Sequence, residues 1–399
     1  MRRGATGTAG LVLAGLVMAG CTAPAGPSTA PSPQPPTVTP SATSAAPTPS
    51  GPSATPAGAP ACTAEAGALG LRRQVGQLVM VGVGVDLTGT QKAAITDHHL
   101  GSAIVMGPTP GGVEQVAELT ARLRELGGED LLVAADQEGG LVQRLKGPGF
   151  GTIPSAARQA RLTDAGLAAA AEGWGRAMAK AGVLLDLAPV ADVVPAKFRA
   201  SNEPVARLGR GYGSDPEKVS KKVAAFSAGL HAAGVGVAVK HFPGLGAVRG
   251  NTDFATSVLD TTTTTSSALL TPFRDAVEHG ADAVMVSSAT YRRIDPDRPA
   301  MFSPTVVGLL REWGFEGVVV SDDLGAAAAL RSVPVARRAE RFVAAGGDLA
   351  LTVDARTAGA MADGLYAAAK DDPELAARVA ESAARVLALK ARLGRFSCG

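Results

Sequence analysis

Short apolar segments alternate with longer helical segments from Leu69 to the C-terminus. Inside the short segments polar residues do not alternate with apolar ones, which predicts parallel strands that are buried on both faces. We expect strands at 78–85, 102–106, 131–135, 183–187, 235–240, 283–287, 318–321 and 349–353. We expect helices between them at 113–126, 164–181, 216–233, 266–279, 304–313 and 334–345.

Two helix starts carry a clear signal. Asp215 precedes Pro216 and Ser303 precedes Pro304, so a capping side chain stands before a proline in the first turn. Eight strand–helix units are the number that closes a (β/α)8 barrel, also called a TIM barrel. An open doubly wound sheet is the alternative, but its usual GxGxxG turn is absent after the first strand, where residues 81–86 read VGVGVD.

The first 20 residues have the composition of an export signal. They begin with Met-Arg-Arg and continue with an apolar run that is too short to span a membrane. The tetrad Met18-Ala19-Gly20-Cys21 resembles a bacterial lipobox. We therefore expect an exported lipoprotein, anchored on the outer face of the cell membrane or in the cell-wall space through a lipid on Cys21. An ordinary signal peptide that is cleaved near Ala23 is the alternative.

Residues 21–61 are predicted to be a disordered spacer, and residues 62–399 to be the barrel domain. The spacer has 12 prolines and no charged residue between Pro24 and Pro60, so it cannot bury enough apolar surface to become ordered. Cys62 and Cys398 stand at the two ends of the domain. In an exported protein we expect these cysteines to form a disulfide, which requires the two ends to be neighbours; two free thiols are the alternative.

Charge and cysteine content exclude two classes of function. The formal net charge is only +2, from 38 basic and 36 acidic residues, so nothing indicates a nucleic-acid partner. Three cysteines and five histidines, without a CxxC or HExxH motif, give no zinc site. We expect no metal ion.

Polar residues gather just after several predicted strands, where the active site of a (β/α)8 barrel lies. The third strand is followed by Asp136-Gln137-Glu138-Gly139-Gly140, and the fifth ends in Lys240-His241-Phe242-Pro243-Gly244. The seventh ends in Ser321-Asp322-Asp323-Leu324. Together with Val142-Gln143-Arg144, these motifs resemble family 3 glycoside hydrolases, and most closely their single-domain, NagZ-like β-N-acetylglucosaminidases. The resemblance covers the chain from about Leu71 to Leu393.

The resemblance implies retaining hydrolysis, in which a carboxylate attacks the anomeric carbon and an acid protonates the leaving oxygen. By motif position Asp322 is the nucleophile, and Asp323 is a supporting hydrogen-bond acceptor or a helix N-cap. The positions that match sugar-contacting residues of the family are Asp136, Arg144, Arg210, Lys240 and His241.

The chain departs from the family pattern in the loop after the Lys-His-Phe-Pro-Gly motif. Relatives carry Asp-Ser-His there, an acid/base dyad, whereas this chain has Asn251 and Asp253 at the two dyad positions. Three outcomes stay open. Asp253 is itself the acid/base, buried when the loop closes; another carboxylate acts or protonation is weak; or the barrel binds sugar with little catalysis.

We interpret the chain as a monomeric exo-β-N-acetylglucosaminidase that removes terminal N-acetylglucosamine from peptidoglycan fragments (muropeptides). No organic cofactor is expected, because carboxylates and water suffice for this chemistry. The alternatives are a catalytically weak muropeptide-binding lipoprotein, and a β-glucosidase or phosphorylase of the same family.

Overall fold

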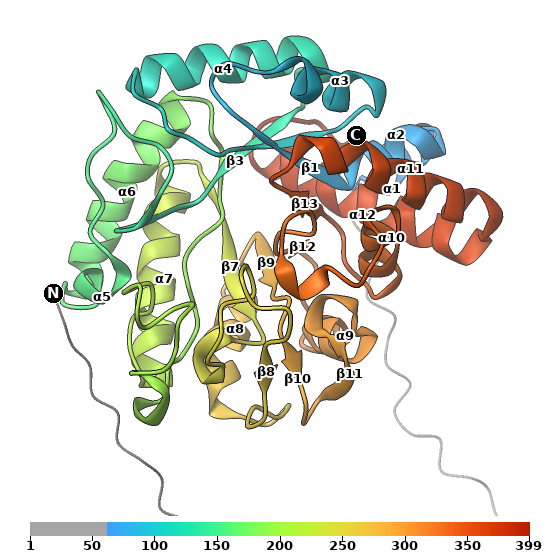
Figure 1. Cartoon of the computed structure of the whole chain (residues 1–399). Helices are drawn as coiled ribbons and strands as arrows, with labels where there is room; N and C mark the ends of the chain where they lie inside the picture. The colour runs from blue at the N-terminus through green and yellow to red at the C-terminus, as the bar shows by residue number, and fades with distance from the viewer. Residues whose placement is uncertain (1–61) are drawn as a thin grey trace, which may run out of the picture. The chain divides into compact units, whose positions relative to one another are not determined.

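Eight parallel strands form the central sheet of residues 62–399, which are the residues described in the computed structural model (Figure 1). The strands are β1 (Val79–Val83), β2 (Ser102–Val105), β3 (Leu132–Ala135), β6 (Leu185–Asp186), β7 (Gly236–Phe242), β9 (Ala283–Val286), β12 (Val318–Ser321) and β13 (Ala350–Thr352). Their spatial order follows the chain order, and β1 pairs with β13. A bridge between Val320 and Leu349 joins the last two strands. The sheet is closed, so the predicted barrel is confirmed and the open doubly wound sheet is wrong.

The strands are apolar on both faces because the two faces have different neighbours. Met80, Ile104 and Leu132 point into the barrel and belong to its inner apolar cluster. Val79 and Val81, which alternate with Met80 along β1, belong to the outer cluster that packs under the helices. Burial of both faces explains why the strand segments contain continuous apolar residues.

The helices surround the barrel and follow the predicted pattern (Figure 1). They are α1 (Thr63–Ala68), α2 (Leu71–Gln77), α3 (Gly89–Asp97), α4 (Gly112–Gly127), α5 (Ala156–Gln159), α6 (Asp164–Lys180), α7 (Pro216–Ala232), α8 (Thr271–Glu278), α9 (Pro304–Glu312), α10 (Val335–Ala344), α11 (Ala355–Asp371) and α12 (Pro373–Arg392). The predicted caps form, since the side chains of Asp215 and Ser303 accept hydrogen bonds from the backbone of Lys218 and Val306. The predicted helix 266–279 begins instead with a 3-10 turn at Ala268–Leu270.

Small strands lie outside the barrel sheet and shape the loops at its ends. A hairpin of β4 (Gln137–Gly139) and β5 (Val142–Gln143) directly follows β3. A second sheet contains β8 (Leu259–Asp260), β10 (Thr290–Tyr291) and β11 (Asp295–Pro299). The β4–β5 hairpin matters for function because it contains Glu138 and places Leu141 in its turn.

The two ends of the domain meet. Cys62, immediately before α1, and Cys398, after α12, form a disulfide with a Cα–Cα distance of 5.0 Å. The signal-peptide, lipidation and spacer predictions concern residues 1–61 and lie outside the described residues. Within the described part, no helix combines the length and the apolar character needed to cross a membrane.

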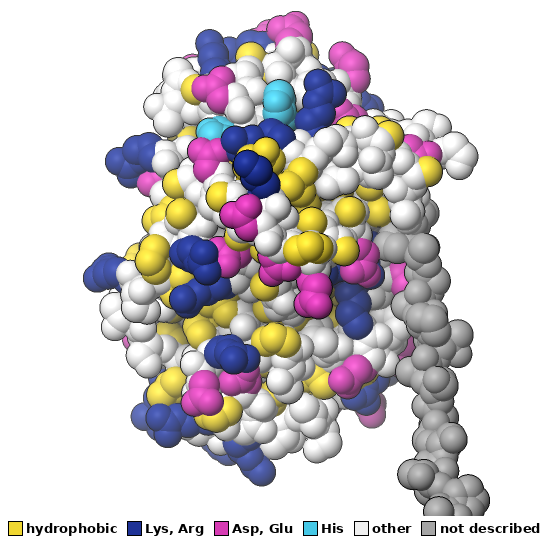
Figure 2. Space-filling view, turned by 90° about the vertical axis from the view of Figure 1, so that its right-hand side faces the viewer, with side chains coloured by type: hydrophobic (Ala, Val, Ile, Leu, Met, Phe, Trp, Pro, Cys, Tyr) yellow, Lys and Arg dark blue, Asp and Glu magenta, His cyan; other side chains and the backbone are white. Residues whose placement is uncertain are grey.

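Surface charge is mixed on the face that Figure 2 shows. Basic and acidic side chains are interspersed there, with apolar side chains between them. This distribution agrees with the near balance of 38 basic and 36 acidic residues in the chain.

Candidate active site

A cavity of about 580 Å³ opens at the C-terminal ends of the barrel strands. Asp136 directly follows β3, Lys240 and His241 lie in the last part of β7, and Asp322 directly follows β12. All seven residues that the sequence indicated for catalysis and sugar binding line this cavity: Asp136, Arg144, Arg210, Lys240, His241, Asp253 and Asp322. Strand ends that are far apart in the sequence therefore meet here, as the barrel geometry requires.

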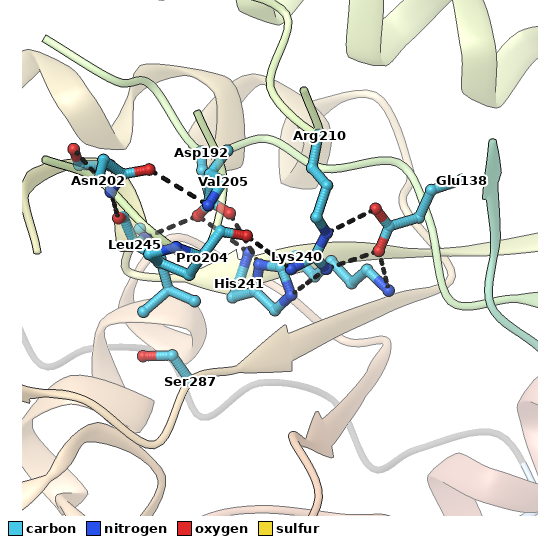
Figure 3. A network of polar contacts seen from close by, with 12 residues as sticks. Glu138, Asp192, Asn202, Pro204, Val205, Arg210, Lys240, His241, Leu245 and Ser287 are labelled. Carbon is cyan, nitrogen blue, oxygen red and sulfur yellow. Dashed lines mark hydrogen bonds and ion pairs between the residues drawn. The ribbon is translucent and has the colours of Figure 1, made fainter. Parts of the chain in front are cut away.

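Glu138 connects two cations at the base of the cavity (Figure 3). Its carboxylate accepts hydrogen bonds from Arg210 Nε at 2.9 Å and Arg210 Nη2 at 2.7 Å. The same carboxylate lies 2.7 Å from Lys240 Nζ, which also donates to Asp136 at 2.7 Å. The side chains of Lys240 and Glu138 are only 2% and 3% exposed, so these charges compensate one another almost without water.

Burial and charge act in opposite directions on this cluster. Burial alone raises the pKa of Glu138, but the charges of Arg210 and Lys240 outweigh it and hold this pKa well below its usual range. Burial lowers the pKa of Lys240, and the carboxylates of Asp136 and Glu138 reverse that effect, so the pKa is raised. Both groups are therefore fully charged at neutral pH, and Lys240 is a permanent donor.

His241 is held between Asp192 and Arg210. Its Nδ1 lies 2.7 Å from Asp192 Oδ2, and its Nε2 lies 3.1 Å from Arg210 Nη2. A guanidinium group can only donate hydrogen bonds, so Nε2 accepts and the ring proton is on Nδ1, where it is donated to Asp192. The two contacts fix the tautomer and the orientation of the imidazole ring.

Asp322 is fixed by the neighbouring strand β9 and by its own backbone. Its backbone N–H donates to Val286 O at 2.9 Å, and its Oδ1 accepts from the N–H of Asp323 at 2.9 Å. Burial raises the pKa of Asp322, and the neighbouring carboxylate of Asp253 raises it further, against the opposing effects of His241 and, more weakly, Lys240. The two carboxylates are thus close enough to influence each other's charge.

Asp323 has a supporting position. It accepts hydrogen bonds from the backbone N–H groups of Gly325, Ala326 and Val353 at 2.9, 2.9 and 3.0 Å. The contact with Val353 ties the loop after β12 to the end of β13. The following alanine-rich segment has a 3-10 turn at Ala328–Leu330 and no α-helix, so the helix N-cap interpretation of Asp323 is wrong.

The loop with Asp253 packs against the segment that follows Asp322. Ala328 N donates to Asp253 O and Ala329 N to Thr252 O, both at 3.3 Å. The side chain of Asp253 is exposed, so the burial that we expected on loop closure is not present in this conformation. Asn251 Oδ1 accepts from Asp253 N at 3.0 Å and forms the turn that presents the Asp253 side chain.

Sequence reasoning missed three residues of the site. Glu138 stands in the motif after the third strand, but nothing in a strand-end motif shows which carboxylate pairs with which cation. Asp192 lies in the loop after β6, outside the motifs considered above. Asn202 has no sequence signal at all. Its side chain donates to Leu245 O at 2.7 Å and Val248 O at 2.9 Å, and thereby joins the loop that contains Arg210 to the loop after β7 (Figure 3).

The chain is similar to known proteins over its barrel. Residues 70–389 match the model of the glycosyl hydrolase family 3 N-terminal domain. A beta-hexosaminidase of Xanthomonas oryzae is 32% identical over 285 residues, which are 69% of this chain and 83% of that protein.

Two solved structures have the same fold and related sequences. A beta-N-acetylhexosaminidase from Beutenbergia cavernae has 43% sequence identity and a TM-score of 0.79, over 81% of this chain and 99% of that chain. LpqI of M. tuberculosis has 30% identity and a TM-score of 0.73, over 83% of this chain and 97% of that chain.

Proposed function

Because this chain belongs to glycosyl hydrolase family 3 and is a β-N-acetylhexosaminidase of that family, we propose that it removes terminal N-acetylglucosamine from peptidoglycan fragments. The proposed reaction is retaining and passes through a covalent glycosyl-enzyme on Asp322. The observation that carries the proposal is the position of Asp322, which directly follows β12 and lines a cavity together with Asp253 and the cations Lys240 and Arg210, both of which pair with the buried Glu138.

The first step forms one bond and breaks another. An oxygen of the Asp322 carboxylate attacks the anomeric carbon, the bond from that carbon to the leaving oxygen breaks, and Asp253 gives its proton to the leaving oxygen. In the second step Asp253 takes a proton from water, and the water oxygen displaces Asp322 from the anomeric carbon. Both carboxyl groups return to their initial states.

The remaining side chains orient the sugar. Lys240, charged and fixed by two carboxylates, presents an ammonium group beside Asp136, and such pairs bind neighbouring hydroxyl groups of a pyranose. His241 keeps one ring orientation because Asp192 and Arg210 occupy both of its nitrogen atoms. A preorganised polar surface of this kind favours the transition state because the protein does not have to reorganise during the reaction.

The proposal is tested with a fluorogenic β-N-acetylglucosaminide and a 5-fluoro glycoside that traps the intermediate. We expect Asp322→Asn to abolish turnover and mass spectrometry to find the trapped sugar on Asp322. Asp297→Asn, an exposed change on β11, is the matched control and should retain full activity. A label on another residue would remove Asp322 from the mechanism, and phosphate-dependent product formation would identify a phosphorylase.

The role of Asp253 has its own test, because an acid matters most for a poor leaving group. Asp253→Asn should lower the hydrolysis of a disaccharide by about 10²–10⁴-fold and largely spare aryl glycosides, whose leaving oxygen needs little protonation. Equal losses on both substrates, or none on either, would exclude Asp253 as the acid.

We also propose that the protein is exported and anchored through Cys21, on the basis of the lipobox-like tetrad. Metabolic labelling with a radioactive fatty acid in a bacterial host should mark the wild-type chain and not the Cys21→Ser variant. Labelling of both chains would contradict the assignment.

A further inference from the structure

Large hydrophobic side chains are exposed at four positions of the described chain: Leu141, Leu162, Phe254 and Leu259. The exposed fraction is 73% for Leu141 and 84% for Phe254, against 40% for each of the other two. Both of the most exposed residues line the catalytic cavity, and the other two do not. Their exposure is therefore concentrated at the site.

The two residues lie on different loops. Leu141 is in the turn between β4 and β5, and Phe254 follows Asp253 in the loop after β7. The turn at Asn251 fixes the backbone at Phe254, since Phe254 N donates to Asn251 O at 3.1 Å. Leu208 and Ala327 add apolar surface to the same cavity. The cavity thus combines a charged base with an apolar margin.

We propose that Leu141 and Phe254 bind the leaving-group part of the substrate, by contact with the apolar face of its first pyranose ring. This inference rests on the proposed function. The acid must reach the glycosidic oxygen, so the residue next to Asp253 on the same turn lies on the leaving-group side of that oxygen. The C–H groups of a pyranose face pack on an aromatic ring, while its hydroxyl groups remain in water.

The size of the surface argues for a sugar ring over a protein partner. An aromatic side chain buries about 150–250 Å² when fully covered, and a specific protein interface needs about 800 Å² per partner. Two side chains cannot supply that area. The first ring of the leaving group is covalently linked to the N-acetylglucosamine unit that binds at Asp322. It therefore needs no larger apolar surface than Leu141 and Phe254 provide.

The test compares ligands that differ only in the second ring. We would measure KM and kcat for the β-1,4-linked disaccharide of N-acetylglucosamine, and the inhibition constant of N-acetylglucosamine itself. Phe254→Ala should raise KM for the disaccharide about tenfold, since aromatic contact and burial together are worth roughly 1.4 kcal/mol. The inhibition constant of the monosaccharide should change less than twofold, and Phe254→Trp should restore the disaccharide KM.

Leu162→Ala is the control, because it shortens an exposed leucine outside the cavity and should alter neither ligand. Binding of the disaccharide to Asp322→Asn and to Asp322→Asn/Phe254→Ala, measured by calorimetry, separates this inference from the proposed reaction. If the wild-type chain is inactive but the loss of Phe254 still lowers disaccharide affinity about tenfold, the proposed hydrolysis is refuted. The same result supports the role of Phe254 in binding the second ring. An unchanged affinity, or an equal loss for the monosaccharide, would overturn the inference.

Discussion

The Glu138→Gln substitution tests the charge cluster at the base of the cavity. Glu138 accepts two hydrogen bonds from Arg210 and forms an ion pair with Lys240, and its side chain is 3% exposed. Glutamine keeps the shape but removes the ion-pair partner of Arg210 and one of the two ion-pair partners of Lys240, which keeps Asp136. Removal of one partner from a buried ion pair costs about 3–5 kcal/mol.

That loss should be visible in thermal unfolding. For a large domain about 1 kcal/mol corresponds to roughly 2 °C in Tm, so we expect Glu138→Gln to unfold roughly 6–10 °C below the wild type at pH 7. Glu203→Gln is the matched control. Glu203 pairs with Arg207 at 3.5 Å, with side chains that are 51% and 60% exposed, and such pairs contribute less than about 1 kcal/mol.

The pH dependence has a defined sign. The pKa of Glu138 is held below its ordinary value of 4.5, so its contribution to stability is complete above that value and is lost as the pH falls below it. The difference in Tm between wild type and Glu138→Gln should be constant near neutrality and should narrow in acid. A difference of less than 2 °C at pH 7, equal to that of Glu203→Gln, would refute the reasoning.

Two further predictions concern stability. Asp186 is buried in β6, and burial raises its pKa from 3.8 to about 8, so the native state keeps a proton that the unfolded chain releases. The stability of the wild type should therefore fall as the pH rises between these two values. The increase in Tm that Asp186→Asn causes should be larger at pH 8 than at pH 5. An equal gain at both pH values would contradict this. Reduction of the Cys62–Cys398 disulfide, or Cys398→Ser, should lower the free energy of unfolding by roughly 2–5 kcal/mol; a denaturation midpoint that is insensitive to reductant would show that the bond does not constrain the unfolded chain.

The barrel could be predicted from the sequence because it depends on local composition. The apolar segments that become β1, β2 and β3 are continuous since both faces of each strand are covered. Capped helix starts at Asp215 and Ser303 are likewise local. The predicted end of β7 was too early. The strand predicted at 235–240 continues to Phe242, because the polar pair Lys240-His241 is accommodated inside the cavity.

The charge pairs of the site could not be predicted from the sequence. Which carboxylate meets Lys240 depends on the orientation of side chains from three different strands, and no spacing in the sequence encodes it. Glu138 lies in the β4–β5 hairpin that follows β3 and meets Lys240 of β7, and Arg210 reaches it from a loop 72 residues away in sequence. Asn202 contacts backbone groups alone: its side-chain N–H groups donate to carbonyls of the loop after β7, and its Oδ1 accepts from the N–H groups of Val205 and Ala206 in its own loop. No sequence motif indicates such contacts.

The loop from Asn251 to Phe254 shows how the replacement of both dyad residues changes the way in which the acid is positioned. In an Asp–His dyad a carboxylate would orient an imidazole, but here the Asn251 side chain orients a backbone N–H group, that of Asp253. The backbone contacts with Ala328 and Ala329 then hold this turn against the segment that follows the nucleophile. The position of the Asp253 carboxylate is therefore set by main-chain geometry, without a partner side chain. An acid that is positioned in this way has no imidazole to orient, so its direction depends on the turn at Asn251 and on the backbone contacts with Ala328 and Ala329.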